Sequence, residues 1–212
     1  MNIKLLSIAV LTAALSMSCG SSNHEEPAAE AHVAHEVQEV VAQSYAINTE
    51  KSSVSWKGEV AGVYGHEGVV NVKSGNVAVT EGKITGGEIT IDMSTIAATD
   101  SASYQDEKGH TIKDLEGHLT TGDFFNTAEF PTATFVVTAV SDSKITGDFT
   151  VRGKTNSEEF IIESSDVSDS NVTVNGTLKF DRQKYDVAWK HYMKDMVLSN
   201  DISLVISVTA TK

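Results

Sequence analysis

The chain has 212 residues, with 16 Lys and Arg side chains against 29 Asp and Glu side chains, so its formal net charge is −13. This acidic excess makes nucleic acid an unsuitable partner, because binding to a phosphate backbone requires a basic surface. The single cysteine, Cys19, excludes a disulfide bond within the chain.

Residues 1–18 have the pattern of a secretory signal peptide. Lys4 is followed by an apolar run from Leu5 to Leu15, which is too short to span a bilayer, and by the small residues Ser16 and Ser18. The junction with Cys19 resembles the lipobox of bacterial lipoproteins, although Ser16 and Ser18 also suit plain secretion. We favour lipidation because a lone exported cysteine has no other partner. This interpretation predicts an exported cell-envelope lipoprotein that is held on a membrane through Cys19.

Residues 19–44 predict a flexible acidic tether. From residue 20 onwards this segment contains five glutamates and no Lys or Arg. His24, His32 and His35, with Glu36 beside them, are metal-ligand types. Ligands on a mobile segment lack a fixed geometry and supporting hydrogen bonds, so we predict no metal site.

Residues 45–212 predict a single all-β domain. Apolar and polar residues alternate most regularly from Val172 to Phe180 and from Ile202 to Ala210, and a period of two is typical of a strand with one dry face. The predicted strands are Ser53 to Gly58, Gly68 to Lys73, Asn76 to Thr80, Lys83 to Met93, Ala133 to Val140, Lys144 to Gly153, Glu158 to Glu163, Asn171 to Phe180, Tyr185 to Trp189 and Asp201 to Thr211.

The alternation stops between Thr99 and Thr132. Within this stretch Ile112, Leu115 and Leu119 recur at helical spacing, which predicts one short helix, near Lys113 to Thr121, in a long crossover. Antiparallel strands with one apolar face must enclose an apolar space. We expect the first strand to pair with a strand of the C-terminal half and so close the sheet.

Several motifs of this domain resemble the YceI-like family. In the family's order they are His66 to Gly75, Gly86 to Met93, Gly117 to Phe125, Phe130-Pro131 with Thr134-Phe135, Ile145 to Gly153, and Phe180 to Tyr185. The resemblance covers nearly all of residues 45–212. It implies an eight-stranded antiparallel barrel, lipocalin-like in architecture, whose interior accommodates a long isoprenoid chain such as a polyprenyl lipid or a quinone tail.

The residues that alternation turns inward are nearly all apolar, as a lipid tail requires. Those expected to line a lipid cavity are Trp56, Ile89, Ile91, Met93, Phe135, Val137, Phe149, Val151, Phe160, Leu178, Phe180, Trp189, Leu204 and Ile206. Val54, Ile162 and Val187 are expected to face inward as well. The same side chains can instead pack on one another, as in a structural surface lipoprotein without a ligand. The resemblance favours the cavity, and with it lipid binding or transport.

Arg182 is the main polar candidate. At a barrel rim it can fork onto a phosphate or a quinone oxygen, or it can pair with a neighbouring carboxylate such as Asp181 or Asp186, which is the commoner arrangement. His66 and His118 lie in the motifs above, but histidines in such places are more often helix or loop contacts than ligands.

The chain carries no recognised enzyme signature. It has no Gly-x-Ser-x-Gly, no His-Glu-x-x-His and no phosphate-binding glycine loop. Glu158 and Glu159 are adjacent on a predicted strand and therefore point to opposite faces. We predict a non-catalytic protein without a cofactor, and an unrecognised envelope enzyme is the remaining alternative.

Residues 188–196 are bulkier and more basic than the turn that relatives often carry, so at the barrel mouth they would alter which ligand enters.

Overall fold

The computed structural model describes residues 41–60, 64–100, 104, 111–189 and 197–212. The expected leader, Cys19 and almost all of the expected tether lie outside the described residues, as does most of the loop at residues 188–196. No helix within the described residues has the length and apolar composition needed to cross a membrane.

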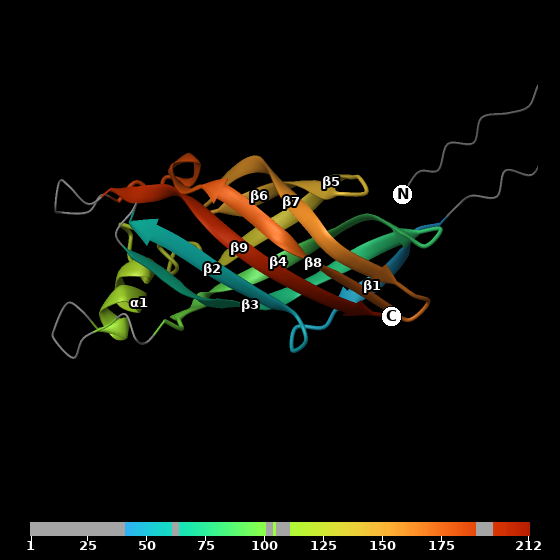
Figure 1. The fold of residues 1–212 in the computed structure, drawn as a ribbon, viewed down its shortest axis with the longest axis horizontal. Coiled ribbons are helices and arrows are strands. Elements are labelled where there is room, and N and C mark those ends of the chain that lie inside the picture. The colour runs from blue at the N-terminus through green and yellow to red at the C-terminus, as the bar shows by residue number, and fades with distance from the viewer. Residues whose placement is uncertain (1–40, 61–63, 101–103, 105–110, 190–196) are drawn as a thin grey trace, which may run out of the picture. The chain divides into compact units, whose positions relative to one another are not determined.

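The described part of the chain is mostly β-strand (Figure 1). Its strands are β1 (Gln43–Ile47), β2 (Ser53–Val60), β3 (Tyr64–Thr80), β4 (Lys83–Ala98), β5 (Thr132–Val140), β6 (Lys144–Val151), β7 (Lys154–Val167), β8 (Asn171–Asp181) and β9 (Leu198–Thr211). The helix α1 (Ile112–Thr120) and the short 3₁₀ turn η2 (Arg182–Tyr185) complete the described elements.

These strands form one closed antiparallel barrel. Around it the strands follow the order β3, β2, β9, β8, β7, β6, β5, β4, and β4 pairs back with β3. β1 and β2 share one place in the wall, because both pair with β3 and with β9 at successive positions. The barrel is therefore eight-stranded, as predicted, and the expected pairing of the first predicted strand with a C-terminal strand is confirmed by β2 and β9.

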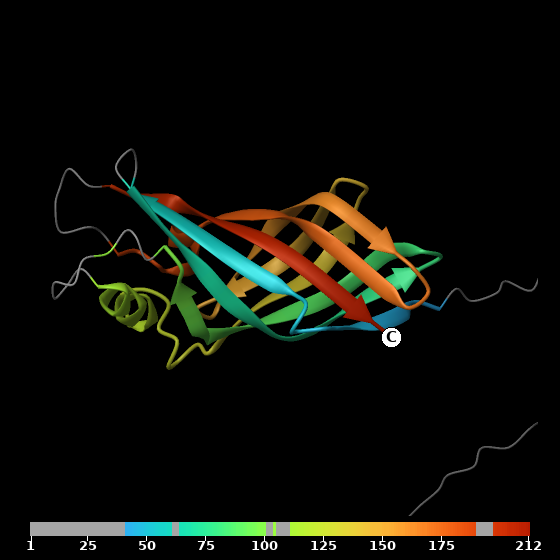
Figure 2. The ribbon, with the colours of Figure 1, turned by 60° about the horizontal axis from the view of Figure 1, so that its bottom comes forward.

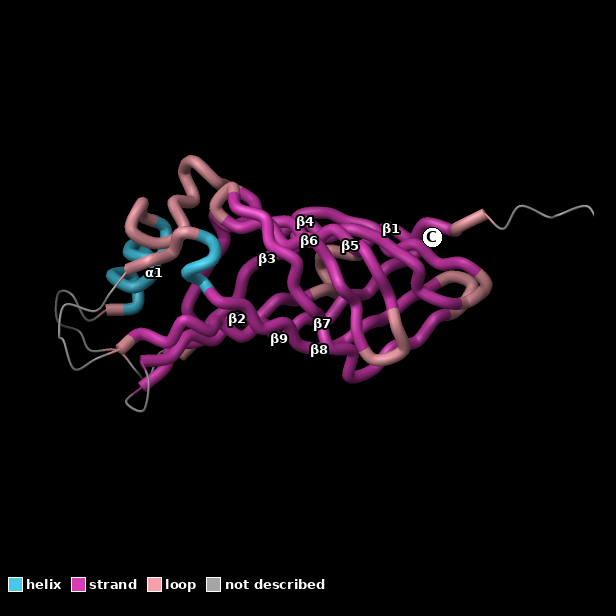
Figure 3. The backbone as a smooth tube through the Cα atoms, turned by 90° about the horizontal axis from the view of Figure 1, so that it is seen from above, coloured by secondary structure: helices cyan, strands magenta, loops and turns pink. Residues whose placement is uncertain are grey.

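The helix lies at one end of the barrel and the C-terminus at the other, as all three views show (Figures 1, 2 and 3). α1 begins one residue before the predicted range and is fixed by a capping box, in which Thr111 and Asp114 each accept from the other's backbone N–H. The side chain of Glu116 accepts a hydrogen bond from the backbone N–H of Ala98, at 3.0 Å, and so attaches the helix to the end of β4.

Side chains fill the barrel end that is remote from α1. Tyr45 of β1 is 1% exposed, and its hydroxyl donates to the backbone oxygen of Ser168 in the β7–β8 turn, at 3.1 Å. Val172 and Ala210 are fully buried beside it. This end is closed by packing.

The predicted division into strands was wrong in two places. Gly68 to Lys73 and Asn76 to Thr80 are parts of the single strand β3. Ser74 and Gly75 are common turn residues, but here they continue the strand after a β-bulge, where the register shifts between Val72 and Ser74, and Gly75 closely approaches the backbone of Glu88. Tyr185 to Trp189 is not a strand: the chain turns through η2 and passes Asp186 in the left-handed conformation, at φ 59°.

Candidate ligand cavity

The barrel encloses a cavity of about 890 Å³, which lies within the usual size range of ligand pockets. Every strand contributes to its lining, and α1 contributes Asp114, Leu115, His118 and Leu119. The apolar faces of the strands meet in this space because the sheet curves fully around it.

All fourteen residues expected to line a lipid cavity border this one. They are Trp56, Ile89, Ile91, Met93, Phe135, Val137, Phe149, Val151, Phe160, Leu178, Phe180, Trp189, Leu204 and Ile206. Val54 borders it too, whereas Ile162 and Val187 are not in its lining. Ile162 lies next to a register shift in β7, and Val187 follows the irregular turn η2, so strict alternation does not apply at either residue.

Glycines in the wall help to explain why side chains leave space inside. Gly58 of β2 lines the cavity, and a Cβ atom built there would have no neighbour within 4 Å in the part of the chain that the structure describes. Aromatic rings lie directly on three other glycines: Trp56 on Gly68, Phe135 on Gly147 and Phe160 on Gly176. These rings therefore pack against the wall.

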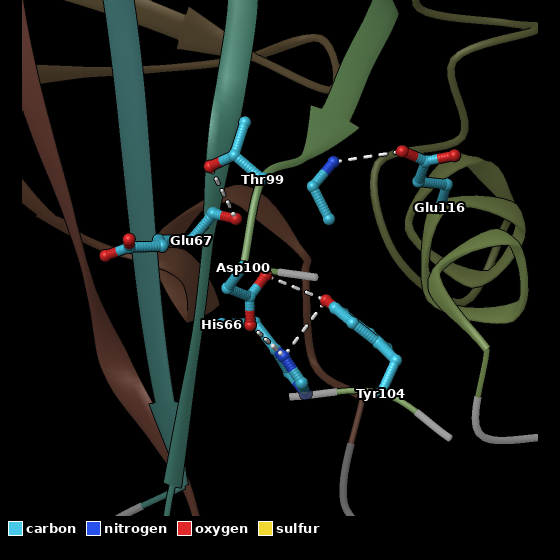
Figure 4. A network of polar contacts seen from close by, with 7 residues as sticks. His66, Glu67, Thr99, Asp100, Tyr104 and Glu116 are labelled. Carbon is cyan, nitrogen blue, oxygen red and sulfur yellow. Dashed lines mark hydrogen bonds and ion pairs between the residues drawn. The ribbon is translucent and has the colours of Figure 1, made fainter. Parts of the chain in front are cut away.

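A polar cluster of His66, Asp100 and Tyr104 lies near the α1 end, and its members come from β3 and the segment after β4 (Figure 4). His66 Nδ1 is 2.9 Å from Asp100 Oδ2, and the Tyr104 hydroxyl donates to Asp100 Oδ1 at 2.9 Å. The Tyr104 hydroxyl is also 3.1 Å from His66 Nδ1, and the two rings stack with centroids 5.1 Å apart. His66 and Tyr104 both line the cavity.

The ionisation of this cluster suits hydrogen bonding more than catalysis. Burial works to raise the pKa of Asp100, but the hydrogen bonds from His66 and Tyr104 outweigh burial and hold that pKa below its usual value. Burial, with the Asp100 carboxylate beside it, raises the pKa of the Tyr104 phenol, so this hydroxyl stays protonated. The phenol is thus a donor rather than an activated nucleophile.

Residues 45–210 match the sequence model of the YceI-like domain. The chain belongs to the YceI-like domain family. This finding confirms the resemblance seen in the sequence motifs. A UPF0312 protein of Staphylococcus aureus strain USA300 is 35% identical over 127 residues, which are 55% of this chain and 72% of that protein.

Two solved structures share this barrel fold. BcnA of Burkholderia cenocepacia aligns with a TM-score of 0.56 at 19% identity, over 78% of this chain and 99% of its own. A polyisoprenoid binding domain from Saccharophagus degradans, implicated in plant cell wall breakdown, aligns with a TM-score of 0.53 at 10% identity, over 79% of this chain and 97% of its own. At these identities the likeness concerns the fold alone.

Arg182 of this YceI-like barrel borders the cavity but is only 2% exposed. Its guanidinium group donates to three backbone oxygens, those of Ser199, Val187 and Leu198. Burial lowers the pKa of Arg182 and nearby Asp181 opposes this change. The sequence suggested that Arg182 binds a ligand or a carboxylate, but its hydrogen bonds go to the backbone. Asp186, one of the carboxylates considered, pairs with Lys154 instead.

His118 of α1 also borders the cavity, and its ring packs edge-on against Phe124 and Trp189. Its Nε2 atom is buried, and none of the described residues forms a hydrogen bond with it. Burial lowers the pKa of His118, which favours the neutral ring, while Asp123 acts in the opposite direction. The two motif histidines thus both reach the cavity, from β3 and from α1.

Glu158 and Glu159 point to opposite faces, as alternation predicted. Glu158 is 8% exposed and accepts a hydrogen bond from the Tyr185 hydroxyl at 3.1 Å, whereas the exposed Glu159 pairs with Lys144. Among the described residues no three metal-ligand side chains come together.

Among the features that the sequence reasoning missed are Gly58, which lines the cavity, and the Asp100 and Tyr104 partners of His66. Gly58 carries an alternation signal, because it continues the inward series of Val54 and Trp56. The other two follow β4 in a segment without periodicity, so no pattern indicated them.

Proposed function

We propose that this barrel binds the long apolar tail of a lipid, such as a polyisoprenoid or a quinone tail, and carries it without chemical turnover. A tail of this kind has no hydrogen bonds to offer, and burying it contributes about 0.8 kcal/mol per methylene group. The solved polyisoprenoid binding domain has the same fold, which supports this proposal.

The observation that carries the proposal is the apolar cavity inside the barrel, which side-chain packing leaves unfilled. Its wall is built from inward aliphatic and aromatic residues, and one end is closed by the packing around Tyr45. A purely structural barrel would gain stability by filling this volume, since voids forfeit packing contacts.

A phenylalanine at Gly58 tests this function. Gly58→Phe places a ring in open space within the cavity, and we expect it to abolish lipid binding while leaving the free energy of unfolding unchanged or higher. Native mass spectrometry of protein gently extracted from its source cell reports the bound mass. Glu59→Phe adds the same ring on the outer face of β2 and should retain the lipid. Wild-type protein that is repeatedly recovered empty would contradict the proposal and favour a structural role.

We also propose that the mature protein is held at the cell envelope through lipidated Cys19. The support is the leader pattern and the lone cysteine directly after it. More than one acyl chain gives stable anchoring where a single chain is marginal. Cys19→Ser should therefore move the protein from the membrane fraction to the soluble fraction of lysed cells. Unchanged membrane association of this variant would exclude the anchor.

A further inference from the structure

His66 is held in one orientation at the α1 end of the cavity. Its ring is stacked on Tyr104, and Tyr64 contacts it edge-on with centroids 5.3 Å apart. Both carboxylate oxygens of Asp100 are engaged, one by His66 and one by Tyr104 (Figure 4). The imidazole is thus fixed by stacking and by hydrogen bonds.

This arrangement determines what the other ring nitrogen can do. Asp100 is ionised and can only accept, so Nδ1 of His66 carries the proton that it donates to Oδ2. In the neutral ring Nε2 is then an acceptor. Among the residues that the structure describes, none donates a hydrogen bond to this atom, although His66 lines the cavity.

Open space lies at the strand position paired with His66. Gly58 of β2 is the cross-strand partner of His66, and side chains at such paired positions are immediate neighbours. A Cβ atom at Gly58 would meet no atom of the described residues within 4 Å. Any larger residue at this position would occupy the space next to the imidazole.

The charges around this space disfavour an anion. The Asp100 carboxylate lies 2.9 Å from the His66 ring. In the described part of the lining the cationic side chain is Arg182, whose donors are engaged by backbone oxygens. A phosphate placed here would approach a carboxylate without a cation to neutralise it.

From these observations we propose that Gly58, His66 and Asp100 form a head-group site that selects an uncharged lipid head carrying an O–H donor, such as a prenol or a hydroquinone. The head-group hydroxyl donates to His66 Nε2 in the space beside Gly58, and Asp100 acts as a positioning residue that sets the tautomer. This inference rests on the proposed binding of an apolar tail and names the chemistry of the head.

Three probes with the same tail test the inference: farnesol, its methyl ether and farnesyl phosphate. Both tryptophans of the chain, Trp56 and Trp189, line the cavity, so intrinsic fluorescence reports binding. At about pH 8 we expect the alcohol to bind about tenfold more tightly than the ether, which lacks the donor. The phosphate should bind more weakly than the alcohol.

Variants test whether His66 and Asp100 cause this preference for the alcohol over the ether. His66→Phe should reduce the alcohol-to-ether ratio to about twofold or less, and Asp100→Asn should reduce it as well, because an amide no longer imposes one tautomer. Glu67→Gln changes an exposed neighbour of His66 and should leave the ratio unaltered. The wild-type comparison requires no variant, so a His66→Phe protein that fails to fold does not remove the test.

Each contrary outcome has a separate meaning. Equal binding of alcohol and ether by wild-type protein, or tighter binding of the phosphate, would overturn the head-group site while leaving tail binding intact. Failure of all three probes to bind would contradict the proposed function itself, and this inference with it.

Discussion

Arg182 stabilises the chain before the last strand by joining η2 to β9. Its guanidinium donates to the backbone oxygens of Ser199, Val187 and Leu198, and the three donor nitrogens belong to one planar group. A buried carbonyl oxygen that loses its donor destabilises the fold. Arg182 therefore supports the cavity wall rather than the ligand.

Arg182→Lys tests this role. A lysine ammonium cannot reproduce the planar fork, so we expect the free energy of unfolding to fall by about 1–3 kcal/mol in urea titrations. Arg152→Lys, the same change at a half-buried arginine, should cost less. A variant that kept full stability but lost lipid binding would instead assign Arg182 to the ligand.

At the scale of the elements, the helix α1 lines one end of the cavity with Leu115, His118 and Leu119. Thr111 caps the first turn of this helix. Removing an N-cap side chain typically destabilises a protein by about 1 kcal/mol. We expect Thr111→Ala to lower the free energy of unfolding by this amount, and Lys113→Ala, an exposed change in the same helix, to alter it by less than about 0.5 kcal/mol. An unchanged stability of Thr111→Ala would show that α1 does not unfold together with the barrel.

At the scale of the whole molecule, the pairing of β2 with β9 joins the N-terminal and C-terminal halves. Ser55 and Val205 are directly paired across it and face outward. Paired Cα atoms lie about 4.5–5.5 Å apart, which suits a disulfide bond. In a Cys19→Ser background, Ser55→Cys with Val205→Cys should oxidise readily, as detected by mass spectrometry under non-reducing conditions.

The matched control keeps Ser55→Cys and moves the second cysteine to another exposed residue. Val136 is also exposed, but it lies on β5, which is separated from β2 by β3 and β4 on one side and by four strands on the other. Ser55→Cys with Val136→Cys should therefore stay reduced. A disulfide in this second pair, or none in the first, would contradict the closed barrel.

The sequence by itself determined the wall of the barrel. A strand turns every second side chain to the same face, so the alternation through Trp56, Phe149 and Leu178 was sufficient to assign inward residues before their partners were known. The helical spacing of Ile112, Leu115 and Leu119 located α1 for the same reason. The eight-stranded closure was implied by resemblance to a family, since a period of two does not state how many strands a sheet contains.

Only the tertiary structure decided what the interior does. Whether inward side chains fill a barrel depends on how far apart its walls lie, and this distance is a property of closure, not of any one strand. The contacts of His66 with Asp100 and Tyr104, and of Arg182 with backbone oxygens of β9, join segments that share no local pattern. Local periodicity reports which face a residue occupies, whereas a site depends on which faces meet.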